Sequence, residues 1–242
     1  MKSAADFRSI AKNALRDKWS LALLAGLLAS LLGAIASYFP HFSFSVPDDS
    51  ISALFDLELS DQLTAIIIGI CLAIIFIALV IGIVRFILGS IILVGYDQFN
   101  LDLVDGQKAP TIGTLFGFFK NWKTVIAAMF LLKLYVFLWT LLFIIPGIIA
   151  SYSYAMTGYI LAEHPELTAS EALKQSKQMM SGNRGRLFCL QLSFIGWDLL
   201  CSFTLGIGNL WLVPYKQAAT AAFYREVSGT EYVASEETDQ TI

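Results

Sequence analysis

The chain has 242 residues, of which 57% are hydrophobic and 14% are charged, and its formal net charge at pH 7 is −3. An ordinary soluble domain is about half apolar and a quarter charged, so this apolar surplus predicts a membrane protein. The chain has no soluble basic region, which excludes a nucleic-acid platform. Its cysteines all fall in apolar runs and are expected to be small buried residues: Cys71, Cys189 and Cys201.

The N-terminal part predicts an amphipathic helix followed by a membrane span. Ser3 and Asp6 form a capping-box-like pair at the start of a helix that runs through Leu15. The apolar run 19–39 is long enough to cross a bilayer and too long for a signal-peptide core, so we interpret it as a retained anchor. Lys and Arg precede this run, whereas residues 40–62 contain neither. The positive-inside rule therefore predicts a cytoplasmic N-terminus and an external 40–62 loop.

The second span, near 63–84, returns to the cytoplasm, but its apolar character extends past Arg85 to about residue 98. Two interpretations are open. One long helix tilts and projects into the cytoplasm, or glycines at 89 and 95 break the helix near the interface. In both cases Arg85 lies at the inner headgroups, where its side chain can snorkel.

The two remaining apolar runs each predict a hairpin. Residues 100–123 and 164–186 both carry Lys and Arg and are both predicted to be cytoplasmic, so an even number of crossings lies between them. The intervening run then forms spans near 124–145 and 147–163, with a turn at Pro146 and Gly147.

The same argument divides the last run into spans near 187–204 and 208–225, with a turn at Gly206 and Gly208. The second arm of each hairpin is short or, in the last case, interrupted by Pro214. Re-entrant arms buried by the bundle are therefore an alternative to full spans.

Together these elements predict an all-α, polytopic integral membrane helical bundle of about six membrane segments. Residues 1–226 form a single membrane domain with both termini in the cytoplasm. Residues 227–242 form an acidic cytoplasmic tail that we expect to be disordered.

The last two hairpins resemble one another in sequence. One pattern of leucines and a tryptophan recurs at the same spacing, from Leu132 to Leu142 and from Leu190 to Leu200, and a glycine-containing turn follows each. A candidate amphipathic helix precedes each of the three pairs of membrane segments, the first pair included. These helices are residues 3–15, residues 111–122 and a helix capped by Ser170. We interpret the chain as three copies of an interfacial helix followed by a membrane hairpin; chance similarity of leucine-rich spans is the alternative. These helices lie on the inner leaflet or pack beneath the bundle.

Three ionisable residues lie well inside the apolar segments: Lys133, Asp198 and Lys216. Charged groups in such positions face a partner or a water-filled cavity. Asp198 precedes the last turn by about as many residues as Lys216 follows it, which predicts an ion pair between antiparallel helices. Gln191, Gln217 and Thr220 can add interhelical hydrogen bonds. We prefer a structural role for these polar residues over a proton or ion relay.

A tyrosine-rich segment admits two interpretations. Tyr152, Tyr154 and Tyr159, with the neighbouring serines Ser151 and Ser153, can line a headgroup-binding cavity or form an aromatic belt at an interface, and the belt is the simpler. The chain contains no nucleophile elbow, phosphate loop, zinc-binding helix or paired catalytic carboxylates. We therefore predict no enzyme activity, no catalytic, cofactor-binding or metal-binding residues, and no cofactor.

Several segments of the C-terminal half carry a family resemblance. They are Phe137–Ala150 with its Ile-Ile-Pro-Gly turn, Glu171–Gly182, Leu192–Trp197, Leu205–Gly208, Pro214-Tyr215 and Ala221–Tyr224. As a block they resemble the bacterial integral membrane family catalogued as domain of unknown function 975, densely over residues 95–226 and more weakly before. The resemblance implies a small polytopic protein of the bacterial cytoplasmic membrane without an established activity, so it brings no catalytic residues. A distant similarity to membrane domains of glycerophosphodiester phosphodiesterases supports no enzyme either, since the hydrolase part has no counterpart here.

The preferred function is a non-enzymatic membrane scaffold or accessory subunit that organises lipid or partner proteins. Its partners are membrane lipids, with membrane proteins or further copies of the chain as additional candidates and no nucleic acid. The alternative is a small transporter or channel-like protein with polar lining from Asp198 and Lys133, and a membrane-embedded lipid enzyme ranks third. A transporter requires a polar cavity that touches Asp198, whereas a scaffold requires only a packed bundle.

Overall fold

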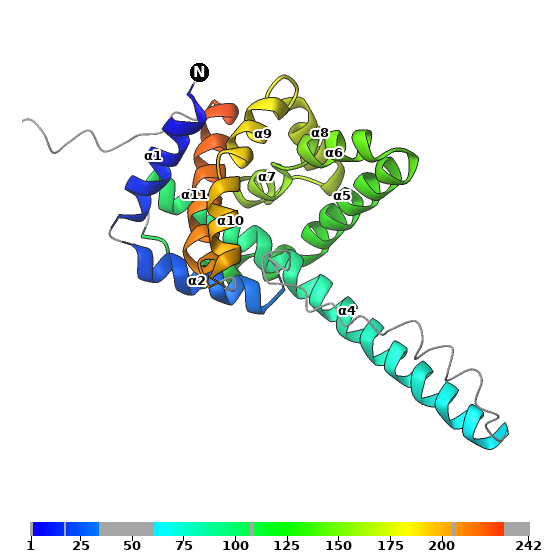
Figure 1. The fold of residues 1–242 in the computed structure, drawn as a ribbon. Coiled ribbons are helices and arrows are strands. Elements are labelled where there is room, and N and C mark those ends of the chain that lie inside the picture. The colour runs from blue at the N-terminus through cyan, green and yellow to red at the C-terminus, as the bar shows by residue number, and fades with distance from the viewer. Residues whose placement is uncertain (1, 17, 34–60, 107–108, 205–206, 230–242) are drawn as a thin grey trace, which may run out of the picture.

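The computed structural model describes residues 2–16, 18–33, 61–106, 109–204 and 207–229. Every regular element in these ranges is a helix, which confirms the all-α class. In chain order they are α1 Ala4–Leu15, α2 Trp19–Leu31, α4 Asp61–Asp105, the 3₁₀ helix η2 Ile112–Asn121, α5 Trp122–Leu142, α6 Ile144–Ser153, α7 Thr157–Glu163, α8 Ala169–Met179, α9 Arg184–Leu192, α10 Ile195–Phe203 and α11 Asn209–Ser228 (Figure 1). Most of the predicted external loop, most of the predicted acidic tail and the turn residue Gly206 lie outside the described residues.

Four helical stretches are long and apolar enough to cross a bilayer: Ala65–Asp105, Ile112–Leu142, Ile144–Glu163 and Arg184–Phe203. They make this a candidate multi-pass membrane protein. The predicted count of six is not reproduced by this criterion. The 13 residues of α2 extend only about 20 Å, and the rest of its predicted span lies outside the described residues. The 20-residue α11 is not among these four stretches, and much of it is buried by other helices.

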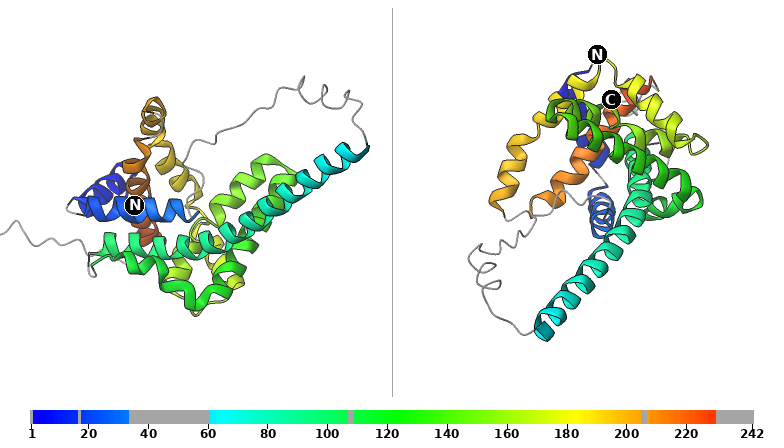
Figure 2. Two further views of the ribbon diagram at one scale, coloured as in Figure 1. Left: turned by 90° about the horizontal axis from the view of Figure 1, so that it is seen from below. Right: turned by 90° about the vertical axis from the view of Figure 1, so that its right-hand side faces the viewer.

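Helix α4 decides between the two interpretations of the second span. It runs without a break for 45 residues, about 68 Å, so neither glycine interrupts it. Residues 65–84 are exposed and almost entirely apolar, and this half projects from the bundle, as the right-hand view of Figure 2 shows. The second half is buried among the other helices, with Tyr96 and Phe99 in the core. Water would not stabilise such an exposed apolar rod, whereas lipid can cover it.

Gly95 allows close packing rather than a break. A Cβ atom at this position would overlap the backbone carbonyl of Leu115 in η2 and lie 2.7 Å from its Cα atom. Backbone atoms cannot move aside as a flexible side chain can. The absence of a side chain at Gly95 therefore lets η2 cross α4 in contact with it.

The second hairpin turns earlier than predicted. Helix α5 ends at Leu142, Phe143 adopts an extended backbone and α6 begins at Ile144. Pro146 and Gly147 lie in the first turn of α6, where a proline is tolerated because that N–H group has no helical partner. The prediction that these two residues form the turn is therefore wrong by about three positions.

Each of the two C-terminal hairpins contains the same kind of close contact between its own two arms. A Cβ atom at Gly147 would lie 2.7 Å from the Cα atom of Thr140, and one at Gly208 would lie 2.6 Å from the Sγ atom of Cys201. Each glycine follows its contact residue by seven positions, so the returning arm approaches the outgoing arm closely at the same place in both hairpins. This likeness agrees with the sequence pattern that the two hairpins share.

Several finer expectations differ from the structure. The predicted 187–204 span is two helices, α9 and α10, separated at Ser193 and Phe194, and α6 and α7 likewise divide the 147–163 arm. Pro214 lies inside α11 and does not end it. The cap of α8 is Thr168, not Ser170, because the Thr168 side chain accepts a hydrogen bond from the Glu171 N–H group. Two of the three cysteines, Cys71 and Cys189, are exposed rather than buried.

The predicted amphipathic helices α1 and α8 pack within the protein. The capping box of α1 is confirmed, since the Asp6 side chain accepts a hydrogen bond from the Ser3 N–H group, which lowers the pKa of Asp6. The apolar face of α1 lies against α11, with the Phe7 and Phe223 ring centroids 5.4 Å apart. On α8, Ala172 and Leu173 are buried. Of the two placements left open by the sequence, the structure has packing against the bundle.

Arg225 connects the C-terminal ends of three helices. Its Nε and Nη2 atoms donate to both carboxylate oxygens of Asp105 on α4, at 2.8 and 2.5 Å. Its Nη1 atom donates to Glu163 on α7, which also accepts a hydrogen bond of 2.7 Å from the Tyr224 hydroxyl. Arg225 is 8% exposed and the side chains of Asp105 and Glu163 are each 25% exposed, so the cation is largely removed from solvent and its partners are partly so. It fixes the ends of α4, α7 and α11 to one another.

We predict that Gly95→Ala destabilises the protein by about 1–3 kcal/mol, because the new methyl group forces η2 away from α4. The measurement is the thermal transition of the purified protein in detergent. Gly82→Ala is the matched control on the same helix, since nothing lies within 4 Å of its Cβ position. Equal transitions for the two variants would contradict the packing role of Gly95.

We predict that Arg225→Ala costs about 3–5 kcal/mol, because two carboxylates lose their cation in a site with little solvent. Arg16→Ala is the control, since Arg16 is exposed and forms no ion pair among the described residues. Chemical unfolding in detergent micelles measures both. A loss for Arg225→Ala no larger than that for the control would argue against the network.

Candidate functional site

A cavity of about 950 Å³ lies between the two C-terminal hairpins. Its walls come from α5 and α6 on one side and from α9, α10 and α11 on the other, while α4 and α7 contribute residues between them (Figure 1). Most of its lining is apolar. Cavities of roughly 300–1,000 Å³ with a few polar groups among apolar side chains are typical of sites for small molecules.

The structure brings the predicted pair Asp198 and Lys216 together on this wall. The Lys216 Nζ atom lies 2.5 and 2.6 Å from the two carboxylate oxygens of Asp198. Asp198 is on α10 and Lys216 on α11, so the contact joins the two arms of the last hairpin. The Asp198 side chain is 40% exposed and that of Lys216 is 18% exposed, and both residues line the cavity.

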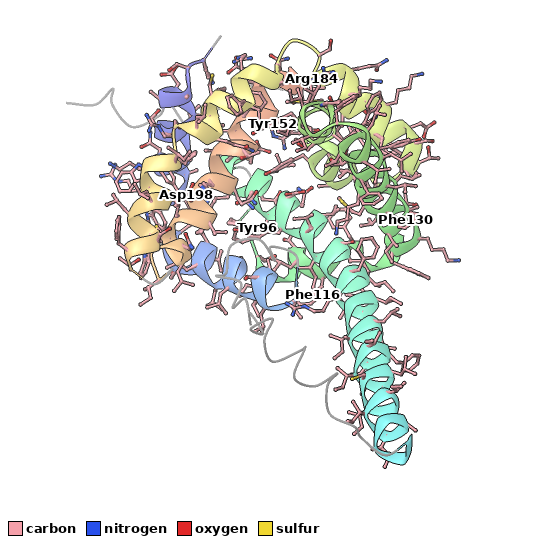
Figure 3. The ribbon with its side chains drawn as sticks, turned by 45° about the vertical axis from the view of Figure 1, so that its right-hand side comes forward. Tyr96, Phe116, Phe130, Tyr152, Arg184 and Asp198 are labelled. Atoms are coloured by element: carbon pink, nitrogen blue, oxygen red, sulfur yellow. The ribbon has the colours of Figure 1, made fainter. Side chains whose placement is uncertain are left out.

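The two predicted glutamines connect the hairpins across the cavity. The Tyr152 hydroxyl on α6 donates to the Gln191 side chain on α9 at 2.6 Å (Tyr152 is labelled in Figure 3). The Tyr159 hydroxyl on α7 donates to the Gln217 side chain on α11 at 3.2 Å. The Thr220 hydroxyl instead donates to the Lys216 carbonyl within its own helix.

The tyrosine cluster faces the cavity. Tyr152, Tyr154 and Tyr159 all line it, as does Ser151, whereas Ser153 accepts a hydrogen bond at its carbonyl from the Ser176 hydroxyl. The Tyr154 ring stacks on that of Tyr135, with centroids 5.9 Å apart. This placement fits the headgroup-cavity interpretation better than the aromatic belt.

Lys133 lies on the opposite wall, on α5, and is not part of the Asp198 pair. Its Nζ atom lies 4.5 Å from the centroid of the Phe86 ring, a cation–π contact with α4. Lys133 also lines the cavity. The cavity is therefore lined by all three ionisable residues that the sequence singled out, which come from two consecutive hairpins.

Asp97 is the site residue that the sequence analysis missed. It lies on α4, is 5% exposed and lines the cavity, and it has no hydrogen bond or ion pair among the described residues. The sequence signal was an acidic residue near the end of the apolar run. The positive-inside rule predicts that this end lies at the cytoplasmic surface, where burial is not expected.

No group of three or more His, Cys, Asp or Glu side chains in the described part of the chain could hold a metal ion. The polar groups of the cavity include two hydroxyl–amide contacts, one ion pair, one lysine, one buried carboxyl group and several further hydroxyl groups. Such a set can bind a polar or charged molecule that also has apolar surface.

The fold and the cavity define a class: an all-helical protein with four candidate membrane-spanning stretches and a partly polar cavity between helical hairpins. Residues 140–231 match the model of a family described as "Protein of unknown function (DUF975)". This match confirms, over that range, the resemblance drawn from the sequence. It covers the final part of α5 and all of α6 to α11. Neither a curated protein nor a solved structure matches the chain.

We predict that Asp198 and Lys216 are energetically coupled. Asp198→Ala and Lys216→Ala should each lower the free energy of unfolding. The loss in the double variant should be smaller than the sum of the two single losses by about 0.5–3 kcal/mol. The Asp198→Lys, Lys216→Asp exchange should restore part of the expression that the single changes reduce. Additive losses in the thermal transitions, without rescue by the exchange, would show that the contact does not stabilise the hairpin.

Proposed function

We propose that this chain is a small polytopic membrane transporter whose substrate path includes the cavity between its two C-terminal hairpins. The observation that carries the proposal is the cavity itself, because Asp198, Lys216 and Lys133 line it within apolar helices. Polar residues at such positions are costly and mark pathways or binding sites in membrane proteins. A scaffold made of a packed bundle has no need of such a cavity.

The proposed membrane arrangement has six segments with both termini on the cytoplasmic side of the bacterial cell membrane. The four apolar stretches supply most of them, while α2 and α11 supply the first and the last. The distribution of Lys and Arg in the sequence supports this orientation. The short apolar length of α2 and the burial of α11 make these two the segments most in need of a topology measurement.

The transporter acts without catalysis, and its surroundings are membrane lipids. Large apolar side chains are exposed at the tip of the α5–α6 hairpin, among them Leu141, Phe143 and Ile145, and acyl chains suit such a surface. The same exposure favours the second candidate, a scaffold that organises lipid or partner proteins. The two functions differ in whether water and substrate reach the cavity.

We predict that a cysteine at Ala155 reacts with a charged, water-soluble thiol reagent, whereas one at Ala73 does not. Ala155 is exposed and lines the cavity, and Ala73 is exposed on the apolar first half of α4. Both changes are made in a variant with serine at 71, 189 and 201, the positions of the free cysteines. Mass shifts after labelling of whole cells and of inverted membrane vesicles measure the reaction from each side.

Labelling of the Ala155→Cys variant from both sides supports a transporter, because its cavity must become accessible to each compartment. Protection from both sides contradicts the transporter and supports a lipid-covered scaffold. Labelling from one side supports a one-sided binding site and also argues against transport. Reaction at position 73 would show that the exposed half of α4 is not covered by lipid.

A further inference from the structure

Asp97 has an unusual environment for a carboxyl group. It is 5% exposed, and the described part of the chain offers it no hydrogen-bond donor and no cation in contact. An isolated carboxylate in an apolar environment is strongly disfavoured, and a bound proton or a bound cation relieves that cost. The group nevertheless borders a cavity large enough for a small molecule.

The other charged groups at the cavity do not supply that cation. From α10 and α11, Asp198 and Lys216 face the cavity as a pair in which Lys216 contacts both carboxylate oxygens. From α5, Lys133 places its Nζ atom over the Phe86 ring. From α6, the α6–α7 segment and α7, the facing titratable groups are Tyr152, Tyr154 and Tyr159. Within the described part of the chain, the acidic group at this cavity without a charged partner is Asp97.

Gly158 on α7 makes room for this carboxyl group. A Cβ atom at Gly158 would overlap the Oδ2 atom of Asp97 and lie 3.2 Å from its Cγ atom. Any larger residue at this position would push the carboxyl group out of its place. The packing of α4 against α7 thus positions Asp97 at the cavity.

The rest of the lining suits a cation with apolar substituents. Tyr152, Tyr154 and Tyr159 contribute aromatic rings, and the negative face of an aromatic ring attracts a cation. Leucine, valine and phenylalanine side chains of α5 and α9 form most of the remaining wall. A strongly hydrated inorganic ion would gain little from these apolar contacts.

We propose that Asp97 binds a lipophilic organic cation, such as a substituted ammonium or phosphonium ion, in exchange for a proton. This inference rests on the proposed function and names its substrate class. In the empty site the carboxyl group holds a proton. When the cation enters, the O–H bond breaks, the proton passes to water and the carboxylate becomes the counter-ion, so the site stays neutral throughout.

The experiment compares two probes of nearly the same shape and opposite charge, tetraphenylphosphonium and tetraphenylborate. Calorimetric titration of the full chain in detergent, in two buffers with different ionisation enthalpies, gives the affinity and the number of protons released. We expect the phosphonium ion to bind with release of up to one proton, and more tightly as the pH rises. The borate ion should bind at least about tenfold more weakly.

Asp97→Asn should reduce the phosphonium affinity at least about tenfold and abolish both proton release and the pH dependence. Asp102→Asn is the matched control, since Asp102 is on the same helix outside this cavity and accepts a hydrogen bond from Gln98. It should bind as the original protein does. Gly158→Ala keeps the acid but displaces it, so it should also weaken binding, and it decides the matter if Asp97→Asn does not fold.

Undiminished phosphonium binding in Asp97→Asn and Gly158→Ala would overturn the inference. It would also be overturned if the borate ion bound more tightly than the phosphonium ion and Lys133→Gln removed that binding. If the cation does not bind while the Ala155→Cys variant is labelled from both sides, the cation site is wrong and the transporter proposal survives. If that cysteine is protected from both sides, the transporter proposal fails independently of the titration.

Discussion

The arrangement of the bundle depends on one buried cation. Arg225 near the end of α11 binds Asp105 at the end of α4 and Glu163 at the end of α7, and Tyr224 completes the network. Because a largely buried charge needs all its partners, these three helix ends are held in one relative position. The cavity lies between hairpins that are also connected across it by the Tyr152–Gln191 and Tyr159–Gln217 hydrogen bonds.

The ionisable residues near the apolar helices differ in their partners. Arg225, Asp105, Glu163, Asp198 and Lys216 form ion pairs in direct contacts that stabilise the helix arrangement, and Lys133 lies over the Phe86 ring. Asp97 is buried without such a contact among the described residues, at a cavity where Tyr152 and Tyr159 donate hydrogen bonds to Gln191 and Gln217. Natural proteins pair buried charges unless the unpaired state has a use. This contrast is why the cavity, and not the network at the base, is the functional candidate.

A bilayer around the protein explains the exposed apolar surface as well as the distribution of charge. One half of α4, the tip of the α5–α6 hairpin and most of α10 place large apolar side chains outside the bundle. In water these surfaces would drive association, whereas in a bilayer they contact acyl chains at little cost. Small residues serve the opposite need, since Gly95 and Gly147 allow backbones to approach where helices meet, and Gly208 allows the close approach of the Cys201 side chain. Lipid contact and helix contact therefore use different residue types along the same helices.

The sequence by itself determined the features that depend on short stretches of chain. These include the helical class, the apolar stretches and the Ser3 capping box. They also include the proximity of Asp198 and Lys216, which lie at similar distances before and after the turn of the last hairpin. Positions set by fine local geometry were less accurate: the turn lies at Phe143 instead of Pro146, and the cap of α8 is Thr168 instead of Ser170. Only the tertiary structure decided that α4 is continuous, that Gly95 is a contact and that Asp97 is buried. These facts depend on contacts of α4 with η2, the next helix in the chain, and with α7 and α11, which come from distant parts of the chain, and no local pattern in residues 85–105 contains that information.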